Sequence, residues 1–253
     1  MGIVNVTPDS FYENSRANDE KKICTTVEQM LSDGAACIDL GAFSTRPGAE
    51  LISEEEEIKR IQNPIKWILN AFPNTLISLD TFRGNVAKTG LDLGVGCIND
   101  ISGGEFDPTL LNIVAAYKVP YILMHSNDKM ENMHSVEQKN NLFQEMMVYF
   151  SKKLNDLNEL GIHDVIIDPG FGFGKTLEEN EYILKNLNLF HVLERPILVG
   201  ISRKSMIYKK LNCTPEEALN GTTVLNTLAV QKGASILRVH DVKEAMEVIQ
   251  LLD

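Results

Sequence analysis

Short apolar segments recur along the chain, and most are followed by a stretch with the spacing of an amphipathic helix. The segments lie at residues 2–7, 37–41, 75–80, 97–101, 121–125, 165–170, 196–202 and 235–240. Their apolar residues are nearly continuous, which is typical of parallel strands that are covered on both sides. The pattern therefore predicts strands and helices in alternation around a parallel sheet.

The number of these units decides between two architectures. Eight strand–helix units in 253 residues match an α/β protein of the (β/α)8 TIM-barrel class in both count and length. A doubly wound open sheet is the alternative, but it usually has fewer strands. No internal repeat, low-complexity tract or linker rich in Pro, Gly or Ser divides the sequence, so we expect a single domain over residues 1–253.

Two helices have clear signals of their own. Ser53 followed by Glu56 predicts a capping box at the start of a helix, and Pro64 is expected to kink that helix. The segment 143–160 has apolar residues at helical spacing after a polar loop. Both helices would cover strands of the predicted barrel.

Composition excludes several classes of protein. The net charge is −11, from 24 basic against 35 acidic residues, and no basic block stands apart, so binding to nucleic acid or an anionic membrane is disfavoured. No apolar stretch approaches the ~18 residues of a membrane span, and the first residues lack the order of a signal peptide. Cys24, Cys37, Cys97 and Cys213 form no Cys-x-x-Cys pair, so we expect reduced thiols in a cytoplasmic protein.

Nearly every apolar segment ends in a polar or Gly-containing group, and in a barrel these ends meet on the face where active sites are built. The groups are Asn5 and Thr7, Asp39 and Gly41, Asp80 and Thr81, Asn99 and Asp100, His125, Asp168, Ser202, and Arg238 and His240. A buried carboxylate such as Asp80 or Asp168 costs several kcal/mol unless it is hydrogen-bonded or paired. Either an internal salt bridge or an aromatic heterocycle with amino and ring N–H donors would satisfy these side chains.

Positive side chains follow several of the same segments. Arg203 and Lys204 come directly after a very apolar run, Arg46 lies in the loop after residues 37–41, and Arg238 lies close to His240. Any single one could be structural. Together, on one rim of an acidic protein, they favour an anionic ligand, and Lys204 could also balance the buried carboxylates.

The Gly-rich segment 170–176 resembles a phosphate-binding loop but fails both spacings. The Walker pattern requires Gly where Pro169 stands, and the third Gly of a Gly-x-Gly-x-x-Gly pattern is replaced by Lys175. The glycines are expected to form a tight turn or to allow close approach of a ligand, with Lys175 solvated beyond them. The histidines show no zinc-ligand spacing, so a structural zinc site is not expected.

Seven short motifs at these segment ends carry a family resemblance. In order they read NVTPDSF, STRPGAE, INDISGG, LMH, DPGFGFGK, GISRKSMI and ILRVHDV. With them the chain resembles dihydropteroate synthase, a family of pterin-binding barrels. That family is a transferase of folate synthesis, which joins 6-hydroxymethyl-7,8-dihydropterin pyrophosphate to p-aminobenzoate and yields 7,8-dihydropteroate and pyrophosphate.

The resemblance implies a role for each matching residue. The pterin would be held by Asp80, Asn99, Ile101, Met124, Asp168, Phe173, Gly200 and Lys204. The p-aminobenzoate pocket would consist of Phe11, Pro47, Ser202 and Lys204, and pyrophosphate would lie on Thr45, Arg46, Arg238 and His240. Asn5 would bind a Mg²⁺ cofactor, and Lys204, Arg238, Asp80 and Asp168 would be catalytic.

The resemblance also implies a dissociative reaction, inhibition by sulfonamides, and a homodimer formed through barrel helices. Three loops depart from the family pattern, at residues 12–15, 42–43 and 126–132, and family members normally have residues before the first strand, which suggests a truncated or omitted N-terminus. Two alternatives stay open. One is a methyltransferase that passes a methyl group from methyltetrahydrofolate to a corrinoid protein, and the other is a non-catalytic pterin-binding homologue.

Overall fold

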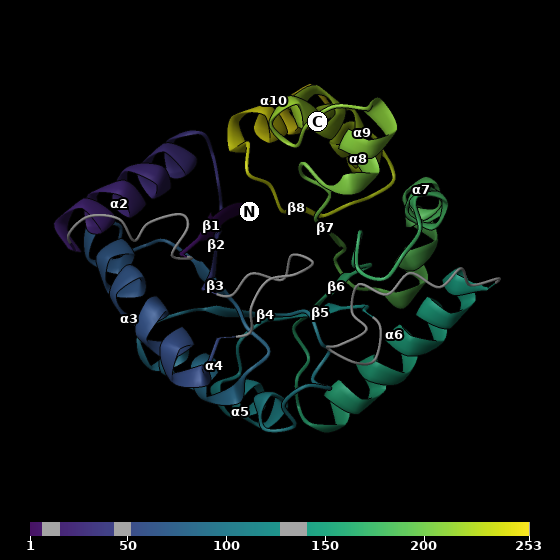
Figure 1. Ribbon diagram of the computed structural model, residues 1–253. Helices are drawn as coiled ribbons and strands as arrows, with labels where there is room; N and C mark the ends of the chain where they lie inside the picture. The colour runs from purple at the N-terminus through teal and green to yellow at the C-terminus, as the bar shows by residue number, and fades with distance from the viewer. Residues whose placement is uncertain (7–15, 43–51, 127–140, 253) are drawn as a thin grey trace.

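The structure is a computed structural model that describes residues 1–6, 16–42, 52–126 and 141–252. Parallel strands and helices alternate along the described chain, as the apolar segments predict (Figure 1). The strands are β1 (Gly2–Asn5), β2 (Ile38–Gly41), β3 (Ile77–Asp80), β4 (Cys97–Asp100), β5 (Tyr121–Met124), β6 (Val165–Asp168), β7 (Leu198–Val199) and β8 (Ile236–Leu237).

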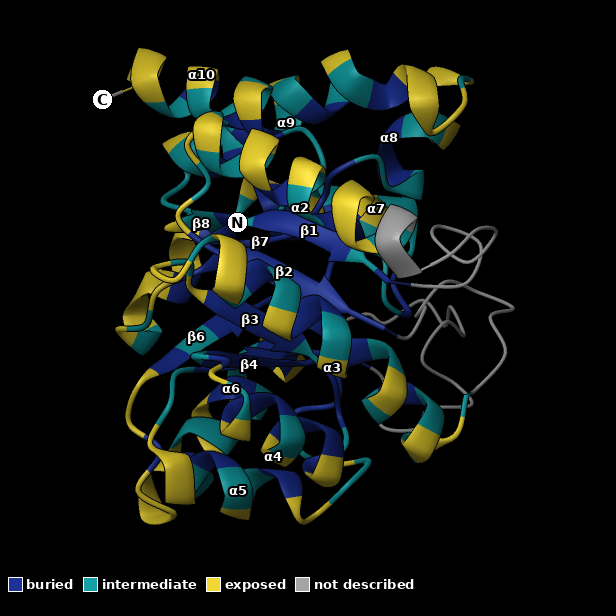
Figure 2. Ribbon diagram, turned by 90° about the vertical axis from the view of Figure 1, so that its left-hand side faces the viewer, coloured by how far each residue is buried: buried dark blue, intermediate teal, exposed yellow. Residues whose placement is uncertain are grey.

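The helices surround these strands (Figures 1 and 2). They are α2 (Arg16–Ser32), α3 (Glu54–Ala71), α4 (Gly84–Asp92), α5 (Leu110–Tyr117), α6 (Leu142–Glu159), α7 (Leu177–Lys185), α8 (Ser205–Leu211), α9 (Leu219–Gln231) and α10 (Val242–Leu252), with 3₁₀ turns η2 (Leu187–Leu193) and η3 (Glu216–Ala218). None of the helices in the described ranges combines the length and the apolar character that a membrane crossing requires.

Backbone hydrogen bonds close the strands into a ring. Strands β1 to β6 pair in sequence order, all parallel, and β7 pairs with β8. The Ile167 amide donates to the Pro196 carbonyl at 3.0 Å, which joins β6 to the segment before β7. The Ile3 amide donates to the Val239 carbonyl at 2.9 Å, which joins β8 back to β1. The predicted TIM barrel is confirmed, because an open sheet would leave these two edges unpaired.

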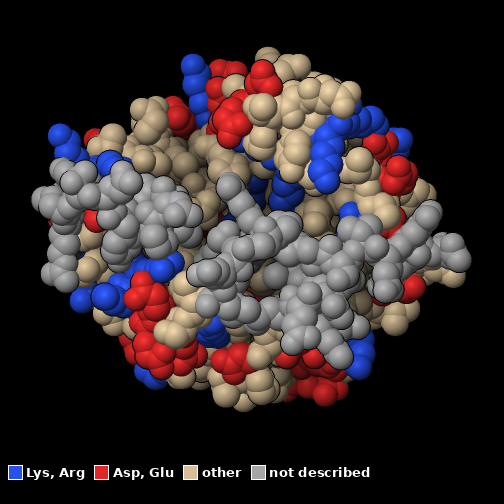
Figure 3. Space-filling view, in the orientation of Figure 1, with Lys and Arg blue, Asp and Glu red and all other residues tan. Residues whose placement is uncertain are grey.

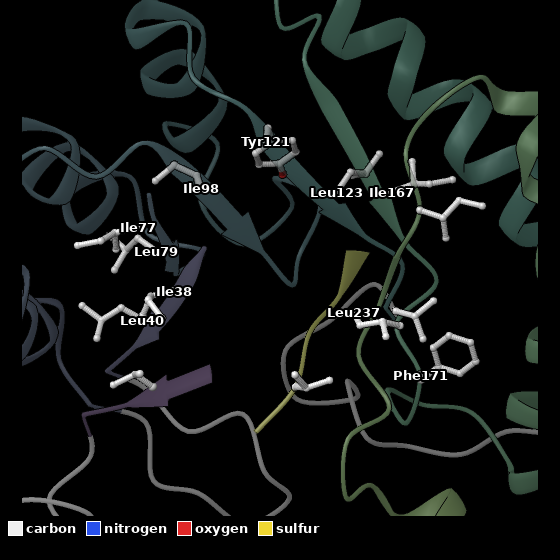
Figure 4. Packing of buried hydrophobic residues seen from close by; sticks show 14 of the residues in the cluster. Ile38, Leu40, Ile77, Leu79, Ile98, Tyr121, Leu123, Ile167, Phe171 and Leu237 are labelled. Atoms are coloured by element: carbon white, nitrogen blue, oxygen red, sulfur yellow. The ribbon is translucent and has the colours of Figure 1, made fainter. Parts of the chain in front are cut away.

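The strands bury apolar side chains on their outer face. Ile38, Leu40, Ile77, Leu79, Ile98 and Leu123 belong to the main core cluster, which the helices complete (Figure 4). Because side chains alternate along a strand, Cys97 and Asn99 of β4 face the opposite way from Ile98. The barrel interior therefore receives a different set of residues from the outer core.

The interior is divided along the barrel axis. Near the amino ends of the strands, Cys97, Ile122 and Leu198 form a small apolar cluster with Met1, Ile166 and Ile236. Cys37 and Cys97 are free thiols there, and burial raises the pKa of each to about 12, so both are inert. Toward the carboxyl ends the inward positions are polar, and this end carries the candidate site.

One detail of the helix starts differs from the sequence prediction. Ser53 Oγ accepts the Glu56 amide at 3.2 Å, but the Glu56 carboxylate pairs with Arg60, so the predicted capping box is only half formed. Helix α3 is assigned without interruption through the buried Pro64. A complete capping box opens α7, where the Thr176 amide donates to Glu179 Oε2 at 2.7 Å and the Glu179 amide donates to Thr176 Oγ1 at 3.0 Å.

Asp100 ends β4, but its carboxylate stabilises the fold and is not part of the polar barrel interior. Its fully buried carboxylate accepts hydrogen bonds from the Ser102 amide and hydroxyl, the Gly104 amide and the Tyr121 hydroxyl. Burial raises the pKa of Asp100, and the Tyr121 hydroxyl opposes that shift. The network fixes the turn that follows β4.

We therefore expect Tyr121→Phe to lower the free energy of unfolding by about 1–3 kcal/mol, because a buried carboxylate loses a donor. Tyr117→Phe is the matched control. It removes a surface hydroxyl that donates to Asp92, and its expected effect is within about 0.5 kcal/mol. Urea unfolding of both variants measures the difference, and equal stabilities would contradict the importance of the Asp100 network.

Candidate active site

A largely buried ion triad crosses the barrel interior at the centre of the polar end. Arg238, directly after β8, donates from Nε to Asp39 Oδ2 at 2.6 Å and from Nη2 to Asp80 Oδ2 at 2.8 Å. Burial raises the pKa of Asp80 to about 7, and Arg238 opposes this shift. Burial also works against the charge of Arg238, but Asp39 and Asp80 outweigh it and hold its pKa above the usual range.

Asp39 is the central residue of this triad, and the sequence analysis places it among the polar strand ends without assigning it a role. It is fully buried in β2, and its Oδ2 also accepts a hydrogen bond from Asn99 Nδ2 at 3.1 Å. Its position inside the apolar run 37–41 offered one signal, since Cys37, Asp39 and Gly41 share a face at period two. The salt bridge anticipated for one of the carboxylates is present between Asp80 and Arg238.

A second charged pair lies on the β6 and β7 side. Burial raises the pKa of Asp168, and Lys204 opposes that shift. Burial lowers the pKa of Lys204 to about 8, and Asp168 opposes that shift in turn. Asp168 Oδ1 accepts the Gly170 amide at 2.7 Å, while Lys204 Nζ donates to the Phe171 carbonyl at 2.6 Å and lies 4.9 Å from the centre of the Phe173 ring.

An apolar cluster adjoins these charges. Phe82, Ile101 and Met124 pack together, with Phe106 and Phe173 against them. The structure thus brings together three residues expected around a flat ligand, Ile101, Met124 and Phe173, and adds two that the motifs did not indicate. Phe82 and Phe106 meet edge to face with ring centres 5.5 Å apart. An apolar wall beside carboxylates suits an aromatic heterocycle with polar edges.

Ser202 and His240 form a pair beside Arg238. Ser202 Oγ lies 2.9 Å from His240 Nδ1, and the His240 amide donates to the same oxygen at 3.2 Å. Gly200 is buried next to Arg238, and a Cβ at this position would lie 3.8 Å from Arg238 Cβ. Seen along the barrel axis, Lys and Arg atoms lie near the middle of this face (Figure 3). The described cations are therefore placed to meet an anion.

The oxygen donors near Asn5 fit the ligand preference of a magnesium ion. A Cβ built at Gly41 would lie 3.6 Å from Asn5 Oδ1 and 3.8 Å from Asp80 Oδ2, so both oxygens lie beside Gly41. Mg²⁺ is usually held by one or two protein oxygens, with waters and phosphate completing the shell. Within the described ranges no group of three or more His, Cys, Asp or Glu side chains forms a metal cage.

Two cations anticipated at the rim have structural partners instead. Lys175, expected to be solvated, is buried, and its Nζ donates to the carbonyls of His125 (3.1 Å), Gly170 (2.9 Å) and Phe173 (3.1 Å). Arg203 makes a two-point ion pair with Asp241, with both N···O distances 2.8 Å. The hypothesis that Arg203 faces an anionic ligand is therefore not supported, and the expectation for Lys175 was wrong.

Backbone geometry explains why the Gly-rich segment 170–176 begins with glycine. Gly170 has φ +68°, and a Cβ there would lie 2.1 Å from the His125 carbonyl oxygen. Both the tight turn and the close approach thus require glycine, and Lys175 binds the same carbonyl groups from inside the loop. Four other predicted site residues, Phe11, Thr45, Arg46 and Pro47, lie outside the described residues.

Comparison with known proteins identifies the class. Residues 1–240 match the family described as pterin binding enzymes. A dihydropteroate synthase from Clostridium beijerinckii is 39% identical over 100% of this chain and 92% of its own length. The dihydropteroate synthase of Yersinia pestis, solved as a sulfonamide drug complex, has TM-score 0.92 and 36% identity over 100% of this chain and 92% of that chain.

A further solved structure, the Clostridium difficile dihydropteroate synthase in the presence of pteroic acid, has TM-score 0.93 and 34% identity over 100% of this chain and 94% of that chain. The fold and the matches define a pterin-binding barrel enzyme. The chain belongs to the pterin-binding enzyme family and, within it, to the dihydropteroate synthases, which are transferases.

The contrast between the two lysines gives a test. Lys175→Met should lower the free energy of unfolding by about 2–4 kcal/mol, because three carbonyls lose a charged donor. Lys204→Met should lower it less, because burial already disfavours the charge of Lys204. Urea unfolding of the two variants measures this order, and a reversed order would show that Lys204 is the structural lysine.

Proposed function

We propose that this chain, acting as one pterin-binding domain over residues 1–253 in the cytoplasm, condenses 6-hydroxymethyl-7,8-dihydropterin pyrophosphate with p-aminobenzoate. The observation that carries this proposal is the meeting of largely buried carboxylates, a partly buried lysine and an apolar wall at one end of the barrel. Such a site pairs hydrogen-bond acceptors with the N–H groups of a pterin edge while the wall packs on its ring face.

The pterin would bind between the two charged pairs. Asp80 and Asp168 accept hydrogen bonds from its N–H donors, with Asn99 beside them, and Lys204 donates to an acceptor on the ring. Ile101, Met124, Phe173 and Gly200 surround its faces. The ion pair of Asp80 and the amide contact of Asp168 support these roles, because each carboxylate is already held in a fixed direction.

The pyrophosphate would lie on the cationic side. Arg238 uses Nε and Nη2 on carboxylates, and no acceptor among the described residues reaches its Nη1, so these donors suit an anion. His240 is beside it, and Thr45 and Arg46 complete the set in our proposal. Asn5 would hold a Mg²⁺ ion, which would neutralise oxygen charge on the leaving group.

The chemistry is a dissociative substitution at the pterin methylene. The C–O bond breaks with its electron pair passing to the pyrophosphate oxygen, and the electron-rich pterin stabilises the methylene cation. The p-aminobenzoate nitrogen then forms the C–N bond and loses a proton. Arg238 and Lys204 stabilise the developing charge, and no covalent protein intermediate is needed.

The second substrate would occupy the rim beside Ser202. Ser202 and Lys204, with Phe11 and Pro47, form its pocket in our proposal, and sulfonamides would compete there. Ser202 is fixed by its contacts with His240, which supports a defined position for its hydroxyl. We further propose a homodimer, which the exposed apolar residues Tyr182 of α7, Leu211 of α8 and Val224 of α9 support.

Turnover tests the proposed reaction directly. Pyrophosphate release should require the pterin substrate, p-aminobenzoate and Mg²⁺ together, and mass spectrometry should identify 7,8-dihydropteroate. Pterin binding without turnover would instead support a non-catalytic homologue. Methyl transfer from methyltetrahydrofolate to a corrinoid protein would support the methyltransferase alternative.

The carboxylates that we propose bind the pterin can be tested by mutation. Asp168→Asn should weaken pterin binding by about 1.5–3 kcal/mol, because a charged acceptor is lost. Asp164→Asn, an exposed position before the same strand, is the control and should bind pterin as the unaltered protein does. Calorimetric titration with pteroic acid measures both, and equal affinities in the two variants would reject the pterin role of Asp168.

Lys204 gives a pH test. Because its pKa is lowered to about 8, the donor loses its charge as the pH rises through 8, and pterin affinity should fall there. The same shift means that the folded state binds fewer protons than the unfolded state between pH 8 and 10.5, so this group's contribution to stability should rise with pH in that window. Lys204→Gln should remove both dependences, and an alkaline limb that persists in this variant would assign it to another group.

A further inference from the structure

The barrel interior holds a carboxylate that has no exposed surface. Asp39 is fully buried, and both of its hydrogen-bond partners, Arg238 and Asn99, are residues of the proposed site. Its other oxygen, Oδ1, is buried, and no described residue donates to it. A buried charge with one unsatisfied oxygen is a poor device for stability, since desolvation costs more than partial pairing returns.

The contact with Asn99 determines how that amide is turned. An ionised carboxylate only accepts hydrogen bonds, so the Asn99 atom at 3.1 Å from Asp39 Oδ2 is the Nδ2 donor. Oδ1 of Asn99 is then the fixed acceptor end of the amide. That end suits a ring N–H donor, whereas a reversed amide would place a donor against it.

The contact with Arg238 restricts the guanidinium in the same way. The Nε donor lies 2.6 Å from Asp39 Oδ2, and the Nη2 donor lies 2.8 Å from Asp80 on the neighbouring strand. Because two carboxylates bind two different donors, the plane of the Arg238 guanidinium is fixed. The direction in which its Nη1 donors point is then fixed as well. One oxygen of Asp39 therefore fixes Asn99, which we assign to the pterin, relative to Arg238, which we assign to the pyrophosphate.

We propose that Asp39 is the positioning residue of the site, which fixes the acceptor end of Asn99 toward a pterin N–H and sets the direction of Arg238. This inference rests on the proposed function, because it assigns these two residues to the pterin and the pyrophosphate. It also explains why a chain would keep a partly satisfied buried charge in its barrel.

Exchange of the two side chains tests the amide contact. Asp39→Asn should weaken pteroic acid binding about tenfold, and Asn99→Asp should weaken it by a similar factor because two carboxylates then face each other. In the double variant the amide at position 39 can donate to the carboxylate at position 99, which still offers an acceptor to the ligand. The double variant should therefore bind at least about fivefold more tightly than the product of the two single losses.

A kinetic readout separates positioning from a merely structural effect. Asp39→Asn should raise KM for the pterin substrate and lower kcat, while KM for p-aminobenzoate stays within about twofold. Ser78→Ala is the matched control, because Ser78 is buried at the register partner of Asp39 in β3 and its hydroxyl forms no hydrogen bond with a proposed site residue in the described part of the chain. This control should keep both KM values.

The outcomes are distinct. If the unaltered protein binds no pteroic acid, the proposed function fails. If it binds but Asp39→Asn binds equally well, or if the losses simply multiply in the double variant, Asp39 does not position the site. Should Asp39→Asn not fold, hydrogen exchange of the Asn99 side-chain amide in the unaltered protein decides. Slow exchange compared with exposed Asn85, whose amide also donates to a carboxylate, supports the contact, and equal exchange overturns it.

Discussion

The pairing of Arg238 with Asp39 and Asp80 is the interaction on which the site depends. These residues come from β2, β3 and the end of β8, so the triad can form only when the barrel is closed. Closure itself rests on the backbone bonds between β1 and the segment after β8. The active end is thus coupled to the completed ring, and no local segment of the chain can assemble it alone.

The polar interior is compatible with folding because the outer core is large and apolar. The strands pack Ile, Leu and Val side chains against the helices on their outer face, while the inner face changes from apolar at the amino ends to charged at the carboxyl ends. Most of the hydrophobic stabilisation therefore comes from outside the ring. This separation lets the inner face carry desolvated charges whose pKa values depart from their usual range.

The sequence predicts the strands well because parallel strands covered on both sides are nearly continuous apolar runs. It also predicts where the strands end, because polar groups stop those runs. It does not reveal long-range partners. Asp39 is one polar strand end among many until Arg238, 199 positions later, is seen beside it. In sequence Lys175 looks solvated and Arg203 looks placed for an anion, but carbonyls bind Lys175 and Asp241 pairs with Arg203 once the loops fold. The half-formed capping box at Ser53 fails because Arg60 competes for Glu56.

The charge balance of the described site explains its remaining chemistry. When all of them are ionised, Asp39, Asp80 and Asp168 carry three negative charges against the two positive charges of Arg238 and Lys204. A pyrophosphate group could not enter such a site on the strength of Arg238 alone, because two carboxylates already share its charge. Further cations on the rim and a divalent ion at Asn5 would reverse the balance.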